Sequence, residues 1–130
     1  MKNIEVSAAI IIKDDILFVT QRGYGDFKVM WEFPGGKLEE GETGEQAIVR
    51  EIKEELNTNI RVIQFLNTIT YQYPNFHLTM HNYICELLDD NIQLLEHEAA
   101  KFVDKKELET VNFLPADLLI LPDLYKYLNI

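Results

Sequence analysis

The sequence predicts an α+β fold in which a mixed β-sheet carries helices on its faces. Runs rich in β-branched and aromatic residues predict strands, hairpins join several of these strands, and an amphipathic helix with a clear start lies between them. The chain has 130 residues, 47% of them hydrophobic, which suits a single domain over residues 1–130 with a substantial core. This length and composition exclude a disordered tail and a large multidomain protein.

The N-terminal segment predicts a hairpin. Residues 4–12 are rich in isoleucine and valine, residues 13–15 are polar and suit a turn, and residues 16–20 resume the strand. After a loop that contains glycine, residues 34–36 read Pro-Gly-Gly. This triplet is expected to stop regular strand pairing and to let the backbone approach a partner closely.

The middle of the chain predicts a helix. Thr43 followed by Gln46 forms a capping box, in which each side chain bonds the backbone amide of the other residue. Apolar residues recur every four positions from Ile48 to Leu56, which gives the helix one buried row. Asn57 tolerates the left-handed conformation and is the expected helix stop.

The second half of the chain predicts two long strands, a short strand, a helical turn and a closing helix. Their predicted bounds are 60–73, 77–88, 101–103, 105–109 and 116–128. Pro74 and Asn75 connect the long strands as a hairpin or short loop, and Pro122 interrupts or shifts the closing helix.

Charge and cysteine content narrow the function classes. Twelve Lys and Arg against 22 Asp and Glu give a net charge of −10, which repels nucleic-acid polymers and anionic membranes. No signal peptide is visible, and no apolar run approaches the roughly 20 residues of a membrane span. Cys85, the only cysteine, is interpreted as a strand residue rather than a nucleophile. We expect a cytoplasmic protein that is a monomer or a homodimer.

Half of the net charge lies in residues 39–55, which hold seven Glu against Arg50 and Lys53. Such a block is most simply a solvated helix face. However, Glu51, Glu54 and Glu55 stand at positions i, i+3 and i+4, so their carboxylates project from one side of the helix, beside its apolar row. Mg²⁺ relieves their repulsion, because it takes oxygen ligands and is commonly held by carboxylates together with substrate phosphates.

The spacing of these residues resembles the Nudix box: a glycine, five residues, a glutamate, seven residues, then Arg-Glu, an aliphatic residue, any residue and Glu-Glu. Gly36, Glu42 and residues 50–55 match this pattern. The pattern continues with a glycine and an aliphatic residue, where this chain has Asn57 and Thr58. We expect the helix stop to survive this departure.

Outer segments are similar to the MutT-like branch of the Nudix family, which acts on nucleoside triphosphates. These segments are residues 31–36, 71–74, 96–98 and 114–117. The resemblance implies the Nudix sandwich, a mixed sheet between helices. It also implies the reaction: water attacks a phosphorus of the triphosphate and releases nucleoside monophosphate and pyrophosphate.

The resemblance assigns roles to individual residues. Arg50 would orient the box carboxylates and Glu42 would brace the loop. The general base would be Glu51, with Glu96, the carboxylate outside the box, as second choice. The implied ligands of Mg²⁺, or alternatively Mn²⁺, are Glu51, Glu54, Glu55, Glu96 and the carbonyl group of Gly35.

The base-binding end is less well defined by the sequence. Phe33, Tyr73 and Phe76 are candidates for a slot in which a base stacks, although aromatic strand residues more often belong to the core. Arg22 is similar in place to an arginine that contacts substrate in the MutT-like branch. Lys28 and Lys37 flank the same loop and are most simply surface residues.

Asp117 stands where related sanitisers of oxidised guanine carry asparagine. An ionised Asp accepts hydrogen bonds only, which favours the exocyclic amine of a cytosine-containing triphosphate such as CTP or dCTP, or of a modified pyrimidine. A protonated Asp also donates, so 8-oxo-dGTP stays open as a substrate. The alternative role for Asp117 is capping of the closing helix.

Three further interpretations stay open. His77 and His81 share a strand face and are interpreted as surface residues rather than a zinc site, and the sequence does not decide whether His97 touches the metal loop.

A Nudix-fold sensor that binds a nucleotide without cleaving it is the alternative outside enzymes, although such modules typically lose box glutamates. Among enzymes, hydrolases of nucleotide sugars or dinucleoside polyphosphates are the alternatives.

Overall fold

The computed structural model describes residues 2–23, 25 and 27–129. Its elements are β1 (Lys2–Lys13), β2 (Ile16–Gln21), β3 (Trp31–Glu32), β4 (Gly35–Lys37), α1 (Gly44–Leu56), β5 (Ile60–Gln72), β6 (Phe76–Leu87), β7 (Ala99–Val103), the 3₁₀ helix η1 (Glu107–Thr110), α2 (Pro115–Leu118) and α3 (Leu121–Leu128). The strand order is β3-β2-β1-β6-β5, with β4 paired to β1 and β7 paired to β2. The sheet is mixed, because β1 and β6 are parallel and the other pairs are antiparallel.

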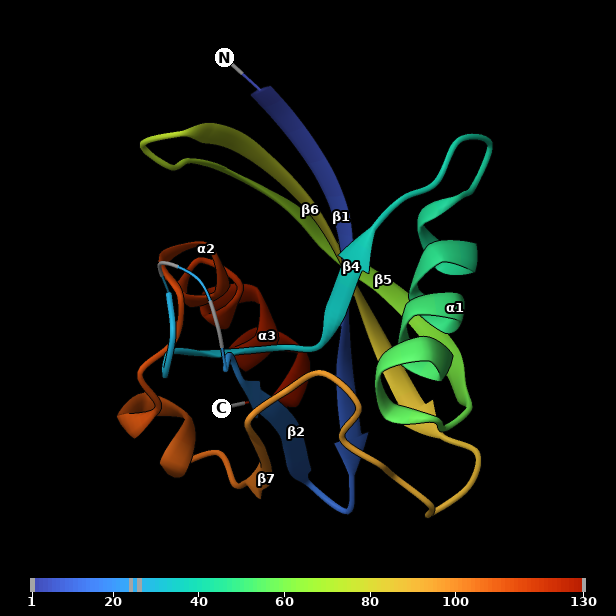
Figure 1. The fold of residues 1–130 in the computed structure, drawn as a ribbon. Coiled ribbons are helices and arrows are strands. Elements are labelled where there is room, and N and C mark those ends of the chain that lie inside the picture. The colour runs from blue at the N-terminus through green and yellow to red at the C-terminus, as the bar shows by residue number, and fades with distance from the viewer. Residues whose placement is uncertain (1, 24, 26, 130) are drawn as a thin grey trace.

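The helices cover opposite faces of the sheet, with α1 on one side and α2 and α3 on the other (Figure 1). Alternation along β1 supplies both cores. Ala9 and Ile11 pack in a cluster with the buried row of α1, whereas Ala8 and Ile10 pack in the cluster that contains Ile120 and Leu124 of the C-terminal helices. The predicted α+β class and the arrangement of sheet between helices are confirmed.

Both predicted ends of α1 are confirmed. The backbone amide of Gln46 donates to Thr43 Oγ1 at 3.1 Å and the amide of Thr43 donates to Gln46 Oε1 at 2.9 Å, which completes the capping box. Asn57 adopts the left-handed conformation, with φ 51° and ψ 40°, and its amide donates to the carbonyl of Lys53. The helix therefore begins after Thr43 and ends at Asn57, as the sequence predicted.

The expectation that Pro34-Gly35-Gly36 stops strand pairing is wrong. Gly35 and Gly36 belong to β4 and pair with Ala8 and Ser7 of β1. A Cβ atom on Gly35 would lie 2.8 Å from the Ala8 Cα, so only glycine lets these two backbones come this close. The glycine pair makes a close strand contact instead of ending the sheet.

The C-terminal segment is interrupted as predicted. The closing helix divides into α2 and α3, with Pro122 in the first turn of α3. Asp117 is not the helix cap, because Pro115 starts α2 and Leu114 is the N-cap residue, so Asp117 lies within the first turn. Among the described residues, none of the helices combines the length and apolar character needed to cross a membrane.

Candidate active site

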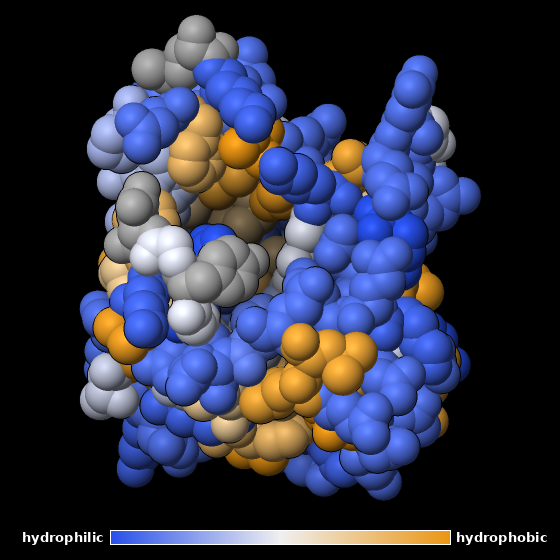
Figure 2. Space-filling model, viewed as in Figure 1, coloured by the Kyte–Doolittle hydropathy of each residue, from blue (hydrophilic) through white to orange (hydrophobic). Residues whose placement is uncertain are grey.

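A cavity of about 400 Å³ opens between α1 and the C-terminal helices. Figure 2 shows this face of the molecule hollowed near its centre, with hydrophobic residues inside the hollow. The predicted site residues on its lining are Arg22, Phe33, Gly35, Glu51, Glu55, Tyr73, Phe76, Glu96 and Asp117. These nine residues come from six separate segments of the chain, and residues of β1 line the cavity as well.

Carboxylates form one end of the cavity. Glu55 is buried, and its Oε2 atom has no hydrogen-bond partner. Burial, reinforced by the nearby charges of Glu51 and Glu96, raises the pKa of Glu55 to about 9. A buried carboxyl beside two others favours a proton or a cation, because either relieves the repulsion.

Arg50 holds the box carboxylates from the outside. Its Nε and Nη2 atoms donate to both oxygens of Glu42 at 2.7 and 2.8 Å, and Nη1 donates to Glu51 at 2.9 Å and to Glu54 at 3.1 Å. The paired hydrogen bonds from Arg50 lower the pKa of Glu42 to about 2. Glu42 therefore stays ionised and anchors the guanidinium group, as expected for a residue that braces the loop.

Gly36 lets β4 approach the carboxylate of Glu51. A Cβ atom at this position would lie 2.3 Å from Glu51 Oε2, closer than any real contact. The glycine of the box therefore creates the space that the Glu51 side chain occupies.

The donor atoms at this end fit a hard divalent cation. Carboxylate oxygens are the preferred ligands of Mg²⁺, and the unpaired oxygen of Glu55 points to a missing positive partner. Within the described part of the chain, no three acidic, histidine or cysteine side chains already form a metal-holding group. In this arrangement Arg50 engages Glu51 and Glu54, and the side chain of Glu54 is 56% exposed.

The loop between β6 and β7 brings Glu96 and His97 to the same end. The side chain of His97 is 8% exposed, and its Nε2 atom lies 3.9 Å from Glu55 Oε2. Burial and the charge of Arg22 lower the pKa of His97, so the neutral form of the ring is favoured. His97 therefore lies beside Glu55 of the carboxylate cluster, a position that the sequence did not indicate.

Aromatic rings form the other end of the cavity. Tyr73 stacks on Phe76 with ring centroids 4.9 Å apart, and Phe27 meets Tyr73 edge-on at 5.1 Å. Phe33 is buried and stacks on Phe113 at 5.1 Å. Tyr73, Phe76 and Phe27 contact one another and all line the cavity, so they form one aromatic wall of a slot, against which a planar ring can stack.

Asp117 lies buried beside this slot. Its Oδ2 atom accepts a 2.9 Å hydrogen bond from the Phe33 amide. Burial, reinforced by the charge of Glu32, raises the pKa of Asp117 well above its ordinary value. This favours the protonated form, which donates as well as accepts, over the ionised form assumed from the sequence.

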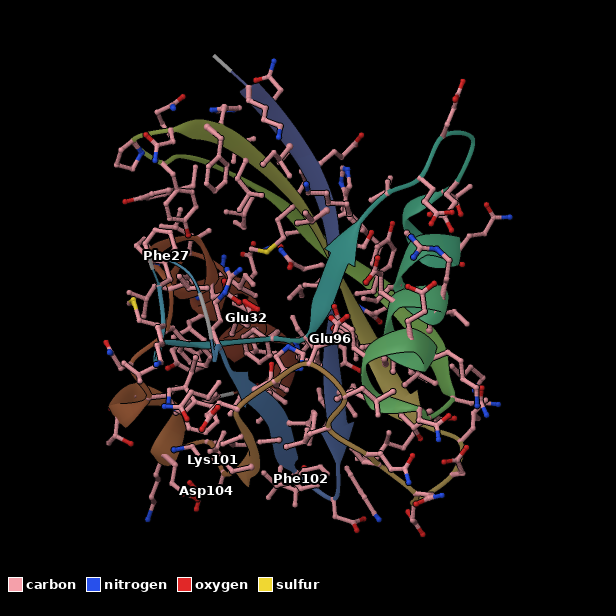
Figure 3. All side chains as sticks on the ribbon, in the orientation of Figure 1. Phe27, Glu32, Glu96, Lys101, Phe102 and Asp104 are labelled. Atoms are coloured by element: carbon pink, nitrogen blue, oxygen red, sulfur yellow. The ribbon has the colours of Figure 1, made fainter. Side chains whose placement is uncertain are left out.

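Sequence reasoning missed several residues of the cavity lining, and Phe27 and Glu32 are the aromatic and the acidic residue among them. Arg22 forms an ion pair with Glu32 at 3.7 Å. Figure 3 shows Glu96 near α1 and Phe27 near α2, with Glu32 between them. Glu32 lies directly before Phe33 in the outer motif, and that position was its only sequence signal.

Two of the predicted residues, Arg50 and Glu54, do not appear on the cavity lining. His77 and His81 pair with Gln72 and Glu5, as expected for strand-surface residues. Cys85 is buried, and burial raises the pKa of its thiol to about 12, in agreement with a structural role.

A family model described as the NUDIX domain matches residues 1–124. The chain belongs to the NUDIX domain family. Nudix hydrolases generally use a divalent metal ion, which agrees with the donor atoms at the acidic end of the cavity.

Relatives and solved structures of this NUDIX domain agree with the assignment. The CTP pyrophosphohydrolase of Escherichia coli is 33% identical over 93% of this chain and 90% of its own. The 8-oxo-dGTP diphosphatase of Proteus vulgaris is 38% identical over 61% of this chain and 72% of its own. The solution structure of the E. coli ORF135 protein superposes with a TM-score of 0.83 at 31% identity, covering 97% of this chain and 91% of its own. The predicted family, fold and pyrophosphohydrolase class are confirmed.

Proposed function

We propose that this NUDIX domain hydrolyses a cytosine-containing or modified nucleoside triphosphate to the monophosphate and pyrophosphate, using Mg²⁺. The observation that carries the proposal is the single cavity with carboxylates at one end and stacked aromatic rings at the other. A nucleoside triphosphate has the same two-part character, with an anionic chain and a planar base.

Glu51, Glu54, Glu55, Glu96 and the Gly35 carbonyl are the proposed ligands of Mg²⁺, with Mn²⁺ as an alternative ion. When bound, the ion neutralises phosphate charge and lowers the pKa of a bound water. The unpaired oxygen of Glu55 and the neighbouring carboxylates of Glu51 and Glu96 support this assignment.

The protein's own groups position the attacking water and the phosphates. Arg50 fixes the orientation of Glu51 through a 2.9 Å hydrogen bond, and Gly36 leaves room for that carboxylate. Glu51 is the proposed general base, with Glu96 second, since both lie on the cavity lining and a carboxylate within reach of the water accepts its proton.

Asp117 is the proposed reader of the base. A protonated carboxyl accepts from the exocyclic amine of cytosine through one oxygen and donates to the ring nitrogen through the other. The relative named CTP pyrophosphohydrolase, which matches 93% of this chain, supports this preference.

A second candidate substrate is 8-oxo-dGTP. The raised pKa of Asp117 favours it, because a carboxyl that donates satisfies the carbonyl group of an oxidised purine as asparagine does. Relatives named 8-oxo-dGTP diphosphatase support the same reading.

A panel of triphosphates tests the proposal. The protein is incubated with Mg²⁺ and CTP, dCTP, methylated and oxidised pyrimidine nucleotides, 8-oxo-dGTP and the four ordinary nucleotides, and pyrophosphate is measured. We expect release from cytosine nucleotides, abolished in Glu51→Gln and retained in the control Glu109→Gln, whose side chain is exposed on η1. The proposal that the protein is an enzyme would be refuted if no nucleotide released pyrophosphate and Glu51→Gln behaved like the parent. A clear preference for 8-oxo-dGTP would select the second candidate.

Three other features stay predictions. We propose one domain over residues 1–130, a cytoplasmic location and a monomeric or homodimeric state. The buried, unpaired Cys85 is compatible with a reducing compartment.

A further inference from the structure

The two residues that depart from the Nudix box both make side-chain hydrogen bonds. Asn57 Nδ2 donates to Gln93 Oε1 at 2.7 Å, and Thr58 Oγ1 donates to Asp89 Oδ1 at 2.7 Å. The glycine and aliphatic residue of the family pattern have no side-chain donor. Both partners lie in the loop of residues 88–98, so the departure ties this loop to the end of α1.

Backbone hydrogen bonds extend the same connection. The amide of Gln93 donates to the carbonyl of Leu56 at 2.8 Å, and the amide of Leu95 donates to the carbonyl of Glu55 at 3.0 Å. These carbonyls belong to the last turn of α1 and lack partners within the helix. The loop therefore supplies hydrogen bonds that the helix end needs.

The residue after Leu95 is Glu96, which the loop carries to the acidic end of the cavity. There it lies on the lining together with Glu55, a residue of the last turn of α1 whose carbonyl accepts the hydrogen bond from the Leu95 amide. The hydrogen bonds from Asn57 and Thr58 hold the same loop against the same end of α1.

The packing of Thr58 agrees with a fixed attachment. Thr58 is fully buried, so its hydroxyl has few other partners. Asn59 Nδ2 donates to the second oxygen of Asp89 at 3.2 Å, and the hydrogen bonds from Thr58 and Asn59 lower the pKa of Asp89. Asp89 is therefore an ionised acceptor held by two adjacent residues.

We propose that Asn57 and Thr58 are positioning residues that latch the 88–98 loop to α1 and hold Glu96 at the metal-binding end of the cavity. The latch consists of the side chains of Asn57, Thr58, Asp89 and Gln93. Its catalytic consequence rests on the proposed function, whereas its effect on the loop and on cation binding does not.

The test compares Thr58→Val, which keeps the shape and removes the hydroxyl, with Thr58→Ser, which keeps the hydroxyl. Asn57→Gly restores the family residue and keeps the left-handed helix stop. Asp89→Asn and Asp90→Asn are a matched pair, because both remove one charge from adjacent positions and Asp90 pairs with Lys13 instead of α1.

Three measurements are made on the full chain: hydrogen exchange of the Leu95 amide, Mn²⁺ affinity from titration of the metal alone, and kcat and KM. In Thr58→Val and Asp89→Asn we expect faster Leu95 exchange, and Mn²⁺ binding and kcat each weakened roughly fivefold. This is less than the 10–100-fold loss for a group that bonds a ligand directly. KM should stay within about twofold, because none of the four latch residues lies on the lining of the cavity. Thr58→Ser and Asp90→Asn should resemble the parent.

The outcomes separate the latch from the proposed function. Parent-like Leu95 exchange in Thr58→Val would overturn the latch itself. Faster exchange with unchanged Mn²⁺ affinity would overturn the positioning role and leave only a local structural one. A parent without pyrophosphate release would refute the proposed function, while exchange and Mn²⁺ binding would still test the latch.

Discussion

Replacing Glu55 by glutamine should remove a pH dependence that this buried carboxyl gives to the metal-free protein. The folded-state pKa of about 9 lies far above the ordinary value of 4.5. Between these values the folded protein holds a proton that the unfolded chain has released. Unfolding therefore releases a proton, and the free energy of unfolding falls as pH rises.

The size of the effect follows from the linkage relation. Between pH 7.0 and 8.5 the free energy of unfolding should fall at about 1.4 kcal/mol per pH unit, which gives about 2 kcal/mol. For 130 residues the entropy of unfolding is about 0.27 kcal/mol/K, so the melting temperature should fall by about 7 °C. The lowered pKa of Glu42 acts below this window, because the unfolded chain has lost that proton by pH 7, and the lowered pKa of His97 acts mostly below it, since an unfolded histidine has lost about three quarters of its proton there.

The assay is thermal unfolding by circular dichroism in EDTA at both pH values. The shift in Glu55→Gln should be about 7 °C smaller than in the parent, and the remaining shift reports the other carboxyls with raised pKa, Asp117 and Glu32. In saturating Mg²⁺ the part of the trend that comes from Glu55 should disappear, because the cation holds this carboxyl ionised and unfolding then releases no proton from it. A parent whose melting temperatures in EDTA agree within about 1 °C, or a glutamine variant with the full shift, would show the reasoning to be wrong.

Three further substitutions test other parts of the cavity. Gly36→Ala places a Cβ atom where the carboxylate of Glu51 lies, at 2.3 Å, so kcat should fall at least about tenfold while the melting temperature changes little. Phe27→Ala removes the ring that meets Tyr73, and KM should rise about fivefold, whereas Phe102→Ala, on β7 and away from the cavity in Figure 3, should leave KM unchanged. Tyr73→Phe removes the hydroxyl that accepts a 3.1 Å hydrogen bond from a buried amide of α2, which should cost about 1–3 kcal/mol in urea unfolding. An unchanged kcat in Gly36→Ala, an unchanged KM in Phe27→Ala or an unchanged unfolding free energy in Tyr73→Phe would contradict the role given to that residue.

Local chemistry accounts for the parts of the fold that the sequence predicted well. The capping box of Thr43 and Gln46 and the left-handed Asn57 depend only on residues nearby in the chain. They can therefore be recognised from the sequence without knowledge of the rest of the fold. Pro34-Gly35-Gly36 was misread because glycine serves both loops and close strand contacts, and only the partner strand distinguishes them. The alternative role of Asp117 as a helix cap is excluded because Pro115 starts the helix earlier.

The active site also combines features that depend on nearby residues with features that depend on contacts between distant parts of the chain. The spacing of the box brings its carboxylates together on one helix, but only the folded loop places Glu96 and His97 beside Glu55. Phe27 carries no periodic signal, since it lies in an irregular segment. The protonation of Asp117 depends on burial by residues far along the chain, which no local pattern records.

The parallel pairing of β1 with β6 has a consequence for how the molecule acquires its activity. Residues 2–11 of the first strand pair with residues 76–85, so the centre of the sheet closes only after most of the chain exists. During synthesis β1 can pair with β2 and β4, but its long parallel pairing with β6 forms only after residues 76–85 have emerged. The cavity, whose lining includes residues of both strands, is therefore assembled late, and a nascent chain should gain its nucleotide-binding capacity in one step near the end of folding.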